Sequence, residues 1–114
     1  MTGKMLVLIT SGLENRDKLL VGMRFAMNSA RKNNLEDVKV VFFGPSEKAI
    51  AGDDQEVRDL YSKLVEHNVT SIACNGYGAA NDLSEGIAKL GVKLENVSDT
   101  IPGFINSGYS VVSF

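Results

Sequence analysis

The 114-residue chain has few of the residue types on which several protein classes depend. It contains one cysteine, two prolines, one histidine and no tryptophan. A single cysteine cannot form an internal disulfide, so the chain does not have the pattern of a disulfide-stabilised secreted domain. The one histidine, His67, lies in no Cys/His cluster, which excludes the usual zinc-site patterns. We therefore expect no metal site, and no motif in the sequence indicates a cofactor.

Strong charge of one sign and long apolar runs are also missing. Twelve basic and 14 acidic residues give a formal net charge of -2, and no Lys/Arg cluster could neutralise a row of phosphates. The longest purely apolar run, Met5–Ile9, is far too short to span a membrane or to form the core of a signal peptide. We expect one cytoplasmic domain over residues 1–114, with no nucleic-acid partner and no membrane association.

Five segments have the apolar, β-branched character of strands, and amphipathic helical patterns separate most of them. The predicted strands are Lys4–Ile9, Val38–Phe43, Val69–Ala73, Val92–Val97 (a short strand or an extended link) and Tyr109–Phe114. The predicted long helices are Asp17–Asn33, Gln55–Glu66 and a third that starts at Ala79 or Leu83 and ends at Leu90. A single helical turn is expected at Glu47–Ala51, and a turn or one helical turn at Ile101–Asn106.

The alternation of strands and helices predicts an α/β fold with three layers, α/β/α, around a mostly parallel sheet of about five strands. Parallel strands need long crossovers, and helices in those crossovers cover the faces of the sheet. Asp53 or Asp54 is expected to cap the helix Gln55–Glu66, and Asp82 with Glu85 reads as a capping box.

Cys74 is the candidate reactive residue, because it directly follows the predicted strand Val69–Ala73. Ligands of open parallel sheets bind beyond the carboxyl ends of the strands. Asn75, Gly76 and Tyr77 come next, and backbone amides in such a turn favour an anion such as a thiolate, which is the nucleophilic form of cysteine. The alternative is that Cys74 is a buried packing residue, as free cysteines often are. Neither a His nor a Lys lies nearby in the sequence to activate it.

Three more residues are predicted to shape a pocket around Cys74. Thr10 and Ser11 follow the first strand, and Pro102 lies in the segment Asp99–Gly108, which is expected to be a loop at the same edge. The Thr10–Asn15 loop is a poor candidate for a phosphate-binding site, because it contains a carboxylate that would repel the phosphate. Gly76-Tyr77-Gly78 follows the wrong strand for a dinucleotide fingerprint and has no acidic partner at the expected distance.

Several short stretches resemble the DsrE/DsrF-like family of small sulfur-relay and sulfur-oxidation proteins. They are Thr10-Ser11-Gly12 after the opening strand, Arg24-Phe25-Ala26, Val40–Gly44, the strand end Ile72-Ala73-Cys74-Asn75, and the closing stretch Ile101–Phe114. The resemblance implies a DsrE/F-like fold and a homo-oligomer, either a trimer or a hexamer. It also implies a persulfide on Cys74 that passes between sulfur donor and acceptor proteins.

Three functions therefore remain open at the level of sequence. The first is a sulfur carrier with a persulfide on Cys74, which leaves open whether the protein is an enzyme. The second is a small-ligand-binding module in which Cys74 is structural. The third is a structural subunit of an oligomer with apolar residues such as Phe104, Ile105 and Tyr109 at the contact.

Overall fold

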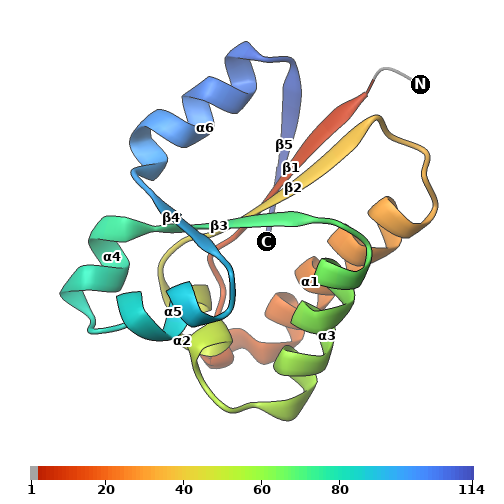
Figure 1. The fold of residues 1–114 in the computed structure, drawn as a ribbon. Helices are drawn as coiled ribbons and strands as arrows, with labels where there is room; N and C mark the ends of the chain where they lie inside the picture. The colour runs from red at the N-terminus through yellow and green to blue at the C-terminus, as the bar shows by residue number, and fades with distance from the viewer. Residues whose placement is uncertain (1–2) are drawn as a thin grey trace.

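The computed structural model describes residues 3–114 and consists of a five-stranded, fully parallel sheet with helices on both faces (Figure 1). The strands are β1 (Lys4–Ile9), β2 (Asp37–Phe42), β3 (Thr70–Cys74), β4 (Lys93–Glu95) and β5 (Tyr109–Ser113). The helices are a short 3-10 helix (Leu13–Asn15), α1 (Arg16–Arg31), α2 (Pro45–Ala51), α3 (Gln55–Glu66), α4 (Asn75–Ala80), α5 (Ser84–Lys89) and α6 (Val97–Asn106). This confirms the predicted α/β architecture. No helix within residues 3–114 is both long and apolar enough to cross a bilayer.

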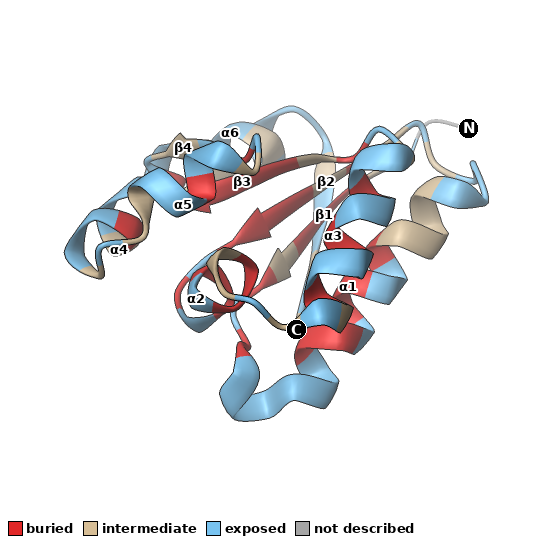
Figure 2. Ribbon diagram, turned by 60° about the horizontal axis from the view of Figure 1, so that its bottom comes forward, coloured by how far each residue is buried: buried red, intermediate tan, exposed pale blue. Residues whose placement is uncertain are grey.

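The strand order β4-β3-β2-β1-β5 decides which face each helix covers. The chain steps in one direction from β1 to β4 and then crosses back to place β5 beside β1. Because crossovers between parallel strands are right-handed, a reversal of direction moves the connecting helix to the opposite face. Accordingly, α6 lies on the other side of the sheet from α1, α2 and α3 (Figure 2).

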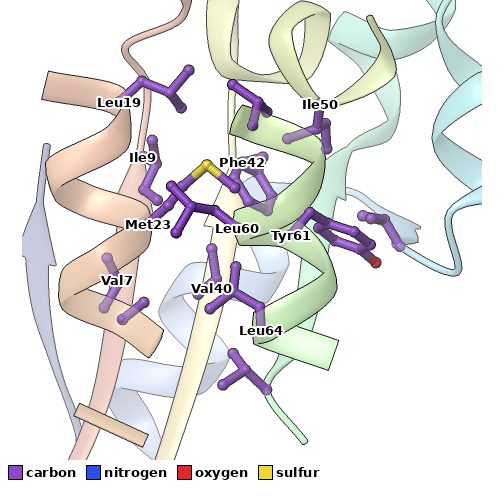
Figure 3. Packing of buried hydrophobic residues seen from close by; sticks show 14 of the residues in the cluster. Val7, Ile9, Leu19, Met23, Val40, Phe42, Ile50, Leu60, Tyr61 and Leu64 are labelled. Atoms are coloured by element: carbon purple, nitrogen blue, oxygen red, sulfur yellow. The ribbon is translucent and has the colours of Figure 1, made fainter. Parts of the chain in front are cut away.

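Most of the core lies between the sheet and the face covered by α1 and α3. Met23 of α1 and Leu60 and Leu64 of α3 pack on Val40 and Phe42 of β2 (Figure 3). A smaller buried cluster on the opposite face consists of Leu6, Val41, Ile72 and Val97, with the half-buried Ile101, Phe104 and Cys74 packed against it. Burial on both faces explains why β1 is an unbroken apolar run from Met5 to Ile9, and why β2 is apolar from Val40 to Phe42.

Two sequence predictions about the helices need correction. The third helix follows the later of its two predicted starts, because α5 (Ser84–Lys89) has Leu83 and Leu90 as its caps, but it is only six residues long. The start at Ala79 is wrong, because a separate six-residue helix, α4, ends before residues 81–83, where Asp82 has a φ of 60°. Aspartate tolerates this left-handed conformation, so Asp82 ends one helix instead of capping the next. The N-cap of α5 is Leu83, which makes no side-chain cap, so the predicted Asp82–Glu85 capping box is not formed.

The second error concerns Ile101–Asn106, which lies within the ten-residue helix α6. Asn96 caps this helix through the Ser98 amide, and Val97, Ile101 and Phe104 form the apolar stripe that packs on the sheet. The spacing of these three residues is helical, but Pro102 obscures it because proline removes one backbone donor inside the helix. The expected loop Asp99–Gly108 is therefore mostly a crossover helix, which returns the chain to the amino end of the sheet.

Candidate functional site at the carboxyl edge of the sheet

Cys74 is the last residue of β3 and the N-cap of α4, one residue later than the strand end predicted from sequence. Cys74 as a whole is half-buried and packs against the small cluster under α6. The Tyr77 amide donates to Sγ over 3.5 Å, and a Cβ added at Gly76 would lie 3.9 Å from the sulfur. The turn after β3 thus surrounds the sulfur with backbone and with a residue that has no side chain.

The topology places Cys74 where two connections leave the sheet on opposite faces. The Cα of Cys74 pairs with that of Glu95 at the end of β4. After β3 the chain turns into α4 and α5, whereas after β4 it turns into α6 on the opposite face. Such a switch point is where parallel α/β sheets bind ligands, because the two loops leave in opposite directions and open a crevice between them.

The predicted binding residues are divided between this switch point and other places. Asn75 and Gly76 are exposed at the start of α4, next to Cys74. Thr10 and Ser11 follow β1, and β2 lies between β1 and β3 in the sheet. Thr10 is exposed and its hydroxyl donates to the carbonyl of Phe114, while Ser11 is buried. Pro102 is exposed within α6, outside any strand-end loop.

A pocket of about 430 Å³ opens at the same edge of the sheet and is here named the strand-end pocket. Apolar side chains form most of its wall, together with one acid and one amine: Leu13, Glu14, Pro45, Lys48, Ala49 and Tyr77. The Lys48 ammonium lies 6.0 Å from the centre of the Tyr77 ring. The volume and composition of the strand-end pocket fit the range of small-ligand sites. Of the residues predicted from sequence, Tyr77 lines it, and Cys74, Thr10 and Ser11 do not.

Glu47 is a buried acid that the sequence reasoning missed. It is fully buried at the start of α2, where Oε2 accepts a 3.0 Å hydrogen bond from the Gly44 amide. Burial raises the pKa of Glu47 above its ordinary value of 4.5, and the amides of Gly44 and Cys74 act in the opposite direction. The available signal was the spacing of Gly44 and Glu47, which is that of the returning half of a capping box.

No group of three or more His, Cys, Asp or Glu side chains within residues 3–114 is arranged to hold a metal ion. The site therefore consists of one thiol, backbone amides, the buried Glu47 carboxyl and the adjoining strand-end pocket. These groups suit sulfur chemistry at Cys74 or the binding of a small molecule.

The comparisons with known proteins establish the fold. No protein-family model matches the chain, and neither does any curated protein sequence. Among solved structures, the chain is similar to BT1422 from Bacteroides thetaiotaomicron, a conserved protein of unknown function, with 18% identity, a TM-score of 0.83, and coverage of 97% of this chain and 94% of that one. It is also similar to the YchN protein from E. coli, with 13% identity, a TM-score of 0.75 and full coverage of both chains. MTH1491 from Methanobacterium thermoautotrophicum, a protein of unknown function, gives 17% identity, a TM-score of 0.75, and coverage of 98% of this chain and 99% of that one. The chain therefore shares one fold, over nearly its whole length, with proteins from two bacteria and from Methanobacterium.

Proposed function

We propose that this protein is a DsrE/DsrF-like sulfur carrier that holds a persulfide on Cys74. The observation that carries the proposal is the position of Cys74 at the switch point of the sheet, half-buried, with the Tyr77 amide on its sulfur. The residues that resemble the DsrE/DsrF-like family add support, as does the fold shared with YchN.

The chemistry is an exchange without net oxidation. The Cys74 thiolate attacks the outer sulfur of a donor persulfide, R–S–SH, and a new S–S bond forms as the donor S–S bond breaks. The donor leaves as a thiolate, and Cys74 becomes Cys–S–SH. An acceptor thiolate then attacks the outer sulfur and releases the Cys74 thiolate. The amide of Tyr77 is the stabiliser of the anionic sulfur in both steps, and donor and acceptor proteins reach it from the solvent side.

The test is to incubate the reduced protein with a persulfide donor, such as glutathione persulfide, and to weigh the intact chain. We expect one added sulfur on the wild type and none on Cys74→Ser, since Cys74 is the one cysteine in the sequence. Equal loading of both proteins, or no loading of the wild type, would contradict the proposal. Glu85→Ala serves as a control, because Glu85 lies on α5 with its side chain 87% exposed.

The carrier is also proposed to be a homo-oligomer, a trimer or a hexamer. Seven large apolar residues among residues 3–114 are more than a third exposed, and Phe43 after β2, Val111 on β5 and Ile105 on α6 are three of them. A second copy would remove this apolar area from water, which is the main driving force for association. Analytical ultracentrifugation measures the state directly, and a particle of one chain would contradict the oligomer.

The strand-end pocket favours a second candidate function, the binding of a small molecule with no covalent step. Its apolar wall and the Lys48 ammonium suit an aromatic anion. Anilinonaphthalene sulfonate is a suitable fluorescent probe. On this reading, Tyr77→Ala and Lys48→Glu weaken probe binding and Cys74→Ser does not. Equal binding by all three variants would contradict it.

A further inference from the structure

The Glu47 carboxyl is the buried ionisable group that neither proposed function uses. Its side chain is fully buried, and its Oε1 atom has no hydrogen-bonding partner among the described residues. An unpaired polar atom in the interior is unfavourable, and natural proteins contain few of them. The contacts around the carboxyl indicate what it does.

Glu47 contacts two of the loops at the carboxyl edge of the sheet. On its own loop, its Oε2 atom accepts the Gly44 amide over 3.0 Å. On the neighbouring loop, the Cys74 amide acts to lower the pKa of the Glu47 carboxyl, against the effect of burial. A Cβ added at Gly78 would lie 3.4 Å from Oε1, so the carboxyl also packs against the far end of the turn after β3.

These contacts lie on both sides of the group that touches the sulfur. Cys74 is the N-cap of α4 and Gly78 is the fourth residue of this helix, and Tyr77, whose amide donates to Sγ, lies between them in its first turn. A carboxyl fixed against both ends of the turn limits the movement of that amide away from the sulfur.

We propose that Glu47 is a positioning residue for Cys74, and that its buried carboxyl sets the turn from Cys74 to Gly78 so that the Tyr77 amide stays on the sulfur. The inference deepens the proposed sulfur-carrier function and rests on it for its biological meaning. It states that the reactivity of the Cys74 thiol depends on the length of the Glu47 side chain, although that side chain does not touch the sulfur.

The experiment separates the reach of the side chain from its charge. Glu47→Asp keeps the carboxyl and shortens the side chain by one methylene, whereas Glu47→Gln keeps the length and an acceptor oxygen but removes the charge. The rate of Cys74 alkylation by iodoacetamide at neutral pH is measured for both folded variants. We expect Glu47→Asp to react about fivefold or more slowly, the factor of roughly one lost hydrogen bond, and Glu47→Gln to react within about twofold of the wild type.

Glu85→Asp is the matched control, because Glu85 lies on α5 with its side chain 87% exposed. Equal alkylation rates for Glu47→Asp and the wild type would overturn the proposal. An equal slowing of Glu47→Asp and Glu47→Gln would also overturn it, because charge and not position would then be responsible. Far-ultraviolet circular dichroism confirms that each variant is folded. If Glu47→Asp does not fold, a Glu47→Gln protein that reacts more than about fivefold slower still overturns the proposal, and a wild-type rate supports it.

Alkylation needs no sulfur donor, so this result is independent of the persulfide test. A wild type that takes up no sulfur but shows the expected pattern of alkylation rates would reject the carrier function and keep the positioning role. If the wild type takes up sulfur and all variants are alkylated at equal rates, the carrier function is kept and the positioning role is rejected.

Discussion

Replacing Glu47 with glutamine should make the free energy of unfolding less sensitive to pH. Glu47 is fully buried, and burial raises its pKa above the ordinary value of 4.5 that it regains in the unfolded chain. Between these two pKa values the folded protein holds a proton that the unfolded chain has lost. The wild type therefore has the full stabilising effect of this group below about pH 4.5 and loses it as the pH rises through the folded pKa.

The size of the effect is bounded by one proton. The free energy of unfolding of the wild type falls, relative to that of Glu47→Gln, by at most about 1.4 kcal/mol per pH unit within this window. Above the folded pKa the difference stays constant. The amide of Glu47→Gln can also lower the free energy of unfolding by a constant amount. This changes the difference between the two proteins equally at every pH and does not change how that difference depends on pH. Asp37 and Asp54, whose pKa values are lowered by their hydrogen-bonding partners, titrate alike in both proteins and cancel.

Urea unfolding followed by circular dichroism, repeated at intervals from about pH 4 to about pH 8, gives the two stability curves. The exposed Glu85→Gln protein is the control and should follow the wild type within about 0.5 kcal/mol at each pH. A constant difference between the Glu47→Gln and wild-type curves over the whole range would refute the reasoning, because it would show that Glu47 binds protons equally in both states.

Four further substitutions test packing and hydrogen bonding in the fold. Gly12→Ala should lower the free energy of unfolding by about 1–3 kcal/mol, because the new Cβ would lie 2.4 Å from the carbonyl oxygen of Pro45. Gly103→Ala, in open space within α6, should leave stability unchanged or raise it by up to about 1 kcal/mol, and the opposite order of these two variants in urea unfolding would contradict the reading. Tyr61→Phe should lose about 1 kcal/mol in the same assay, because its buried hydroxyl donates over 3.0 Å to the carbonyl that ends α5. The Tyr109 hydroxyl donates to the Asp37 carboxylate of β2, and this hydrogen bond raises the pKa of Tyr109 to about 12. Tyr109→Phe should therefore lower the free energy of unfolding, by an amount that becomes smaller at acidic pH as Asp37 becomes protonated. A loss of stability that is independent of pH would contradict this.

The local patterns of the sequence were sufficient for most of the sheet. Strand β1 and helix α3 occupy the predicted residues, and each end of the other strands lies within two residues of its prediction. These segments were predictable because continuous burial gives an unbroken apolar run and a covering helix gives a stripe of apolar residues. Helix α6 was missed because Pro102 is a local signal against a helix, and packing of Val97, Ile101 and Phe104 on the sheet overrides it.

The sequence by itself determined the fold class and the position of the one cysteine at a strand end. Both follow from periodicity and chain order, which are local properties. Only the tertiary structure decided that Cys74 lies beside Glu95 at the switch point, that Thr10 and Ser11 are separated from it by β2, and that Glu47 packs on its turn. These are contacts between residues distant in the chain. They depend on the order of strands and on which face each crossover helix covers, and no local pattern of residues specifies either.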